Sequence, residues 1–148
     1  MATLALNKRA GYDYDLLETF EGGLKLTGPE VKSLRAGHAQ FKGSFLHVQR
    51  GELWLKNFHI SPYAPSAAKQ ATYDPGRDRK VLVKKRELAR FAGKTHAEGL
   101  TLVPISVYTR GSFLKLGFAL ARGKKKYEKR DAIKKREVQR ELRDRMKE

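Results

Sequence analysis

The feature that most constrains the fold is an alternating apolar pattern near the end of the chain. Between Phe113 and Ala121, every second position is apolar: Leu114, Leu116, Phe118 and Leu120. This spacing predicts a strand with one apolar face and with Lys115 on the other face. A similar segment, Leu100 to Thr109, precedes it across Arg110-Gly111, and the pair predicts a β-hairpin. Pro104 cannot donate a ladder hydrogen bond, so we expect a sheet edge or a bulge there.

The middle of the chain predicts a second hairpin. Phe45 to Arg50 and Leu53 to Ile60 flank Gly51-Glu52, which is typical of a tight turn. Strict alternation places Trp54, Phe58 and Ile60 on one face of the second strand, with Leu55, Asn57 and His59 on the other.

Shorter strands are predicted at Tyr12–Leu16, at Leu24–Leu26 and at Arg79–Lys85, with Gly22-Gly23 interrupting the first two. The segment from Ser61 to Asp78 contains several prolines and almost no periodicity. It is therefore predicted to be a long loop.

Two short helices are predicted between the strands. Thr27 followed by Glu30 fits a capping box, or Gly28 caps the helix with Pro29 at its first position, and Gly37 ends it. The second helix covers Glu87 to Ala92 and ends at Gly93. Lys32 and Arg35 would lie on the solvent side of the first helix. These elements predict a mainly β fold: a small closed antiparallel barrel with short helices over residues 1–122, whose interior is filled by side chains.

The charge points to a polyanionic partner. The formal net charge is +16 over 148 residues, and nucleic acid is the first candidate, with a membrane surface second. No window approaches the roughly 18 apolar residues of a membrane-spanning helix. Cysteine is absent, and the four histidines lack the spacing of a metal site. We therefore expect a cytoplasmic monomer with no metal, no cofactor and no catalytic site.

Cations and aromatic residues supply the candidate binding groups. Six cations cluster around one predicted strand and would neutralise phosphates: Arg77, Arg79, Lys80, Lys84, Lys85 and Arg86. Five aromatic residues could stack on unpaired bases, with core packing as the alternative for each: Tyr12, Tyr14, Phe41, Tyr63 and Tyr73.

Residues 123–148 form a separate basic tail. The 25 residues after Gly123 contain 12 Lys/Arg against 6 Asp/Glu. Val138, Leu142 and Met146 would align on a helix, but this stripe is too narrow to dock a helix firmly. We expect a tail that is disordered when free and becomes helical against a polyanion, roughly from Asp131 to Met146. A merely solubilising tail is the alternative.

Six segments carry a resemblance to a known family, in the family's order and spacing. They are 4–10 (LALNKRA), 28–37 (GPEVKSLRAG), 51–52 (GE), 57–60 (NFHI), 79–83 (RKVLV) and 123–130 (GKKKYEKR). Together they resemble the small protein B family, the SsrA-binding proteins of bacterial trans-translation. The family often has Asp-Lys-Arg where Glu128-Lys129-Arg130 stands here, and Tyr127 occupies a position that can be His.

The resemblance implies an oligonucleotide-binding-type barrel. Such a protein binds the tRNA-like domain of transfer-messenger RNA and delivers it to the vacant A site of a stalled ribosome. By position, the residues that match the family's RNA-binding surface include Glu21, Leu82 and Lys115, with Asn7, Lys8, Arg9 and Arg35 as further candidates. The distribution of charge adds other cations as expected RNA contacts: Lys32, Arg79, Lys80, Lys84 and Lys85. Glu21 would accept hydrogen bonds from a base or ribose, with a solvated strand end as the alternative. Leu82 is either interface or core.

The tail would enter the decoding centre and the mRNA channel. The residues expected to contact the ribosome there are Lys124, Lys125, Lys126, Tyr127, Lys129 and Arg130. The alternative function is a structural RNA-binding component of the small ribosomal subunit, which would have the same basic barrel and an RNA-ordered tail.

Overall fold

The computed structural model of the chain describes residues 2–63 and 72–124. The described part contains nine strands and three helices. In chain order they are β1 (Ala2–Leu6), α1 (Ala10–Asp13), β2 (Tyr14–Leu24), α2 (Gly28–Arg35), β3 (Ala39–Gln40), β4 (Phe45–Gln49), β5 (Glu52–Lys56), β6 (His59–Ile60), β7 (Arg79–Leu82), α3 (Lys85–Ala97), β8 (Thr101–Arg110) and β9 (Phe113–Gly123).

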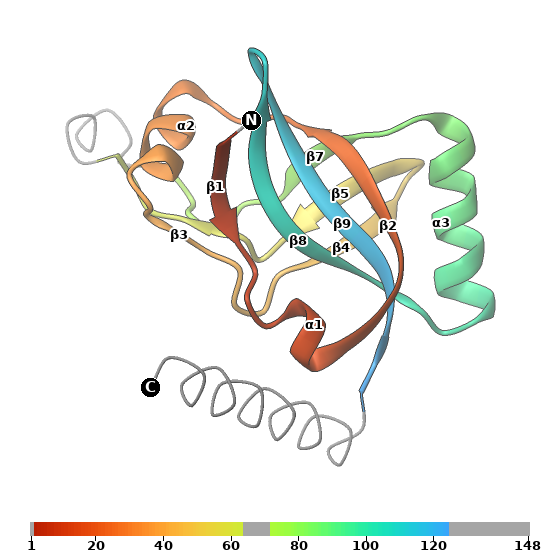
Figure 1. The fold of residues 1–148 in the computed structure, drawn as a ribbon. Coiled ribbons are helices and arrows are strands. Elements are labelled where there is room, and N and C mark those ends of the chain that lie inside the picture. Colours follow the sequence, from red (N-terminus) through yellow and green to blue (C-terminus); the bar gives the residue numbers. More distant parts are fainter. Residues whose placement is uncertain (1, 64–71, 125–148) are drawn as a thin grey trace, which may run out of the picture.

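Six antiparallel strands form a closed ring (Figure 1). Neighbouring strands pair in the order β8-β4-β5-β7-β2-β9, and β9 pairs again with β8. β1 pairs with β8 outside the ring, while β3 and β6 form a separate two-stranded sheet. The predicted fold class, a mainly β closed antiparallel fold with short helices, is confirmed.

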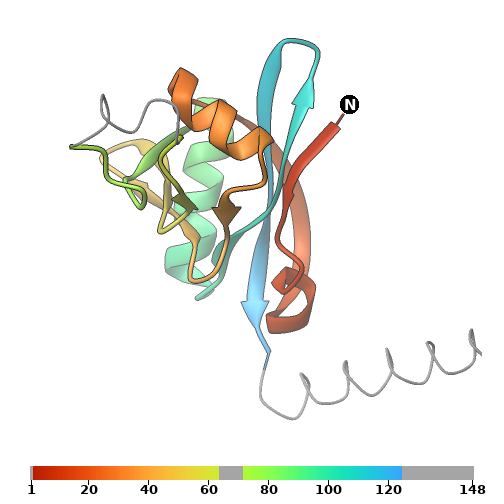
Figure 2. The ribbon, with the colours of Figure 1, turned by 90° about the vertical axis from the view of Figure 1, so that its left-hand side faces the viewer.

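The core fills the interior of the ring. The alternating face predicted for β9 is confirmed, since Leu116, Phe118 and Leu120 are all buried. Phe91 of α3 closes one side, with its ring centroid 4.6 Å from that of Phe20 and 5.5 Å from that of Phe118. Figure 2 shows that α2 and α3 lie to one side of the β8–β9 hairpin, and β1 and α1 to the other.

The predicted capping box begins α2. The Thr27 hydroxyl accepts from the Glu30 amide (3.4 Å), and the Glu30 carboxylate accepts from the Thr27 amide (3.0 Å). These two bonds satisfy donors that have no partner within the helix. The helix ends before Gly37, whose φ of +83° suits glycine. Local sequence therefore determines this helix.

The hairpin of β4 and β5 corrects three predictions: the position of its turn, the end of its second strand and the face on which Trp54 lies. Its turn is at Arg50-Gly51, one residue earlier than expected, with φ of +54° and +71°. The predicted second strand ends at Lys56 because Asn57 adopts a left-handed φ of +57°. This residue interrupts the alternation, so that Leu53 and Leu55 are buried as well as Phe58 and Ile60. Trp54 consequently lies on the outer face, away from Phe58.

The predicted break at Gly22-Gly23 is wrong, because both glycines lie inside β2. A Cβ on Gly22 would lie 2.6 Å from the Val81 side chain, so glycine allows β7 to approach. β2 pairs with β9 through most of its length and with β7 at its end. The glycines therefore permit the close contact that closes the ring.

Other element boundaries also differ from the predictions. β2 begins at Tyr14, because Ala10–Asp13 forms the short helix α1 where a strand was predicted. The strand predicted at 79–85 ends at Leu82, and α3 runs from Lys85 to Ala97 through Gly93. The bulge expected at Pro104 is confirmed by a register shift between Pro104 and Ser106. The turn of that hairpin lies at Gly111-Ser112 rather than Arg110-Gly111.

Candidate nucleic-acid interface

The sheet register brings the predicted residues Glu21, Leu82 and Lys115 onto one outer face. Leu82 of β7 lies opposite Gly23 of β2, which lies opposite Lys115 of β9. Glu21 comes two residues before Gly23 and so shares its face of β2. Leu82 is 54% exposed, so the structure places it on the surface and not in the core.

β8 adds two side chains that the sequence analysis did not select. The Tyr108 hydroxyl donates to Glu21, and Arg110 Nη1 donates to the other Glu21 oxygen at 3.1 Å. Burial, followed by the hydrogen bond and the charge of Glu21, raises the pKa of Tyr108 to about 12. Tyr108 therefore remains a hydrogen-bond donor at neutral pH.

The tip of the β8–β9 hairpin adds an exposed aromatic ring. Phe113 is 68% exposed, and the Lys115 ammonium lies 5.8 Å from its ring centroid. The sequence contained a signal for this residue: in the alternating pattern of β9, Phe113 falls on the same face as Lys115, opposite to the buried face. We call this surface the Glu21 face: it comprises Glu21, Leu82, Tyr108, Arg110, Phe113 and Lys115. It offers cations, an aromatic ring and an acceptor carboxylate, which are the groups that contact phosphates and bases in RNA.

A second group of predicted residues lies at the other end of the long strands, around α1. Lys8 and Arg9 are exposed there, and Arg9 pairs with Asp13. Asn7 is tied to β8, since its Nδ2 donates to the Pro104 carbonyl at 2.8 Å. Lys124 Nζ donates to the Gly11 carbonyl at 3.0 Å. These residues do not join the Glu21 face.

Arg79, a predicted RNA contact, is completely buried. Its guanidinium donates to Glu30 (2.8 Å), to the Tyr73 hydroxyl (2.9 Å) and to the carbonyls of Phe58, Pro75 and Arg77. With its donors bound inside the protein, Arg79 cannot reach a phosphate in this fold. The physical reason is that Glu30 of α2 is itself buried and requires a cation beside it. The order of charges along the sequence does not reveal this pairing.

Glu30 also binds Arg77, so two arginines share one buried carboxylate. Burial opposes ionisation of Glu30, but hydrogen bonds from Arg77 and the Thr27 amide, together with Arg79, outweigh it and lower the pKa to about 2. We call this group the Glu30 network: Thr27, Glu30, Tyr73, Arg77 and Arg79. Its hydrogen bonds and ion pairs join α2 to Arg77, which precedes β7, and to Arg79 at the start of β7.

The remaining predicted cations are distributed over the surface. Lys84 and Lys85 are exposed at the start of α3, where the helix dipole is already positive. Lys80 pairs with Glu52 at 2.9 Å. Lys32 and Arg35 are exposed on α2, as predicted. The expected cluster around one strand is therefore divided between β7, α3 and the interior.

The aromatic residues proposed for stacking have different surroundings. Phe41 is buried and stacks on Phe58, with centroids 4.5 Å apart, so the core alternative holds for it. Tyr73 belongs to the Glu30 network. Tyr12 lies beside Arg9, and Tyr63 beside Lys32. Tyr14 packs against the small cluster of Ala10, Val103 and Ala121.

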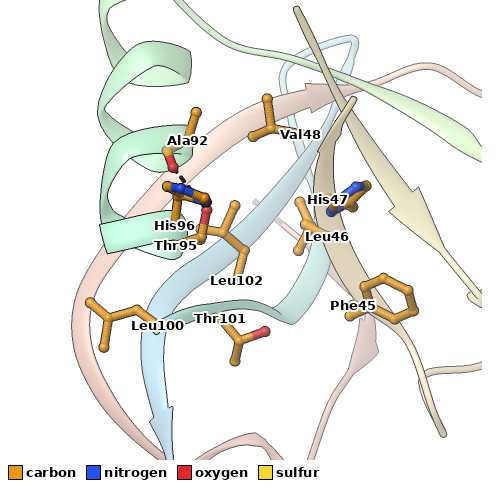
Figure 3. Close-up of a pocket in the computed structure, with 10 residues that line it drawn as sticks. All are labelled: Phe45, Leu46, His47, Val48, Ala92, Thr95, His96, Leu100, Thr101 and Leu102. Carbon is orange, nitrogen blue, oxygen red and sulfur yellow. Dashed lines mark hydrogen bonds between the residues drawn. The ribbon is translucent and has the colours of Figure 1, made fainter. Parts of the chain in front are cut away.

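Two grooves lie outside the Glu21 face. One, of about 1030 Å³, runs along β1 and α1 past Lys8 and Arg9. The other, of about 510 Å³, lies between α3, β4 and β8, and Figure 3 shows His47 and His96 among its lining residues. Within residues 2–63 and 72–124, no group of three or more potential metal ligands occurs. The helices in the same residues are all too short or too polar to cross a membrane.

The fold and the Glu21 face together define a class: small, strongly basic β-ring proteins whose exposed face has the chemistry of an RNA interface. Comparison with known proteins identifies one family within this class. The SmpB protein family matches residues 4–148. The chain belongs to this family.

Individual relatives agree along nearly the whole chain. The SsrA-binding protein of Desulforudis audaxviator is 49% identical over 140 residues, covering 95% of this chain and 90% of that protein. The SsrA-binding protein of Streptococcus mutans is 45% identical, covering 97% and 92%. A solved structure described as "tmRNA-SmpB: a journey to the center of the bacterial ribosome" contains a chain that is 44% identical. It superposes with a TM-score of 0.67 and covers 87% of this chain and 93% of that one.

Proposed function

We propose that this protein binds the tRNA-like domain of transfer-messenger RNA and delivers it to the vacant A site of stalled ribosomes. The observation that carries the proposal is membership in the SmpB family over residues 4–148. Relatives at 45–49% identity are SsrA-binding proteins, and the similar solved structure concerns tmRNA-SmpB and the bacterial ribosome. The protein acts in this scheme as a cytoplasmic, monomeric adaptor, without a catalytic role or a cofactor.

The Glu21 face is the proposed contact with the tRNA-like domain. Lys115 and Arg110 supply phosphate contacts, Phe113 offers a ring for stacking, and Leu82 supplies apolar area. Glu21 would repel a phosphate and is therefore assigned to a base or ribose donor. Lys32, Arg35, Lys84 and Lys85 are exposed and remain candidate phosphate contacts.

The proposed division of labour assigns ribosome binding to the tail, residues 123–148. β9 continues to Gly123, so the strand reaches the proposed boundary. Lys124 is described, whereas Lys125, Lys126, Tyr127, Lys129, Arg130 and the helix proposed for 131–146 lie outside the described residues. The proposal for these residues rests on the sequence alone: 12 cations among 25 residues suit an RNA-walled channel.

The test is to sequence the RNA that co-purifies with the tagged protein and to measure its stoichiometry on ribosomes. Transfer-messenger RNA should dominate, and few ribosomes should carry the protein. Occupancy of every small subunit, with no enrichment of that RNA, would instead establish the alternative of a structural ribosomal component. A variant that ends at Lys124 should bind the tRNA-like domain and yet fail to support peptide tagging.

A further inference from the structure

Tyr108 reaches Glu21 across an intervening strand. The two residues are 87 positions apart in sequence, on β8 and β2, and β9 pairs with both strands. Glu21 lies opposite Gly117 of β9, and Gly117 lies opposite Ser106 of β8. The Tyr108 side chain must therefore pass over β9 to place its hydroxyl on the carboxylate.

Gly117 provides the space for this crossing. A Cβ at Gly117 would lie 3.2 Å from the Ser106 hydroxyl and 3.4 Å from Cε1 of the Tyr108 ring. Gly117 is not one of the described glycines with a positive φ, so its backbone conformation does not require glycine. What glycine supplies here is the absence of a side chain beneath the ring.

The second support of Glu21 is Arg110, two residues along β8 on the same face. Its Nη1 donates to Glu21 Oε1, while Tyr108 donates to Oε2. The Glu21 side chain is 29% exposed and that of Arg110 is 61% exposed. Each carboxylate oxygen has a further lone pair, and the guanidinium has four more N–H donors. The carboxylate is thus fixed in orientation yet still accessible to a ligand.

We propose that Tyr108 and Arg110 are positioning residues that orient the Glu21 carboxylate to accept hydrogen bonds from RNA, with Gly117 as the spacer that lets Tyr108 reach it. This inference rests on the proposed function. The ligand groups are the N–H and O–H donors of RNA, namely a base amino or imino group or a ribose 2′-hydroxyl. Because these two donors already restrict the rotamers of Glu21, the side chain loses less conformational entropy when the RNA binds.

The raised pKa of Tyr108 fits this role, since a protonated hydroxyl must be present at neutral pH to hold the carboxylate. Glu18 provides an internal comparison on the same strand. It is also ion-paired with an arginine, Arg90, at 2.5 Å, but this partner comes from α3, and no tyrosine among residues 2–63 and 72–124 donates to it. Glu18 lies outside the Glu21 face.

The test is a double-mutant cycle in the full-length chain, with binding measured to a transcript of the tRNA-like domain of transfer-messenger RNA. Tyr108→Phe and Glu21→Gln should each weaken binding about tenfold, as expected for the loss of a hydrogen bond to a charged group. In the Glu21→Gln background, Tyr108→Phe should have almost no further effect, because the residue acts through Glu21. Arg110→Lys should retain more affinity than Arg110→Ala, since lysine keeps a charged donor.

Glu18→Gln is the matched control and should bind as the unmodified chain does. Unfolding of each variant in urea separates positioning from stability, because a merely structural Tyr108 would lower the free energy of unfolding and weaken binding equally in both backgrounds. Additive losses, or unchanged binding by Tyr108→Phe, would overturn the inference and leave the proposed function intact. Failure of the unmodified chain to bind the transcript would instead overturn the proposed function, and this inference with it.

Discussion

The carboxylates of Glu30 and Glu21 are each held by a tyrosine and by arginine, and their surroundings differ. Glu30 is 1% exposed and binds Arg77 and Arg79, with Tyr73 beside them. Glu21 is 29% exposed and binds Arg110 and Tyr108. The same chemical groups join elements of the fold in one place and present an accessible acceptor in the other.

The comparison shows that burial determines whether such a carboxylate and its partners stabilise the fold or can bind a ligand. In the Glu30 network nearly every donor is used inside the protein, so removing one partner leaves an uncompensated buried charge. On the Glu21 face, water can solvate whatever a substitution leaves unpaired. Substitutions in the first group should therefore change stability, and those in the second should change RNA binding.

The largest effect is expected from Arg79→Met. It leaves the buried Glu30 with Arg77 as its remaining cation, and the free energy of unfolding should fall by about 3–5 kcal/mol. Urea unfolding measures this loss. The matched control is Arg110→Met, where the exposed partner of Glu21 is removed and the change should stay within about 0.5 kcal/mol. Equal losses in both variants would contradict the comparison.

The second-largest effect is expected when the free energy of unfolding is measured at acid pH. The pKa of Glu30 is about 2 in the folded protein against an ordinary 4.5, so the unfolded chain binds more protons between these values. The stabilisation is fully present above pH 4.5 and is lost as the pH falls towards 2, for a total of about 3 kcal/mol. Urea unfolding from neutral pH to about pH 2 measures it. Glu30→Gln should flatten this part of the profile, and an unaltered profile would show that Glu30 is not its source.

A smaller effect, on binding alone, is expected from Leu82→Glu. Leu82 is exposed, so stability should change little, whereas affinity for the tRNA-like domain should fall by about 1–2 kcal/mol, or roughly 5- to 30-fold. Leu17→Glu is the matched control, because Leu17 is also an exposed leucine, four residues before Glu21 in β2, and is not one of the six residues that define the Glu21 face. Filter binding at one salt concentration compares the three proteins. If the two variants lose affinity equally, general charge repulsion is the cause and the Glu21 face is not the contact.

The smallest effect on affinity is expected from charge reversal at Lys84 and Lys85, which are exposed and screened by salt. The slope of log K against log salt should decrease by about 0.7–0.9 for each lysine that contacts a phosphate. A salt titration of RNA binding measures the slope. Lys94→Glu, at the other end of α3, serves as the control. An unchanged slope in the Lys84 and Lys85 variant would remove the start of α3 from the interface.

Short-range patterns in the sequence determined a large part of this structure. The alternation at Leu116, Phe118 and Leu120 identified the buried face of β9, and Thr27 with Glu30 identified the start of α2. Pro104 marked the bulge in β8. Each of these signals acts between residues that are neighbours in the chain, because it depends on strand pleat, helix capping or a missing amide hydrogen. The family resemblance also brought Glu21, Leu82 and Lys115 together before the fold was known.

Only the tertiary structure decided which groups share a site and which are buried. Asn57, with its left-handed backbone, changed the face that Leu53 and Trp54 present, and no strict alternation could show this. Arg79 was indistinguishable from an exposed cation until Glu30 was placed beside it, 49 residues away in sequence. Tyr108 meets Glu21 because β9 runs between their strands and Gly117 leaves room for the ring. Burial and long-range pairing depend on how the ring of strands closes, and that closure is a property of the whole chain.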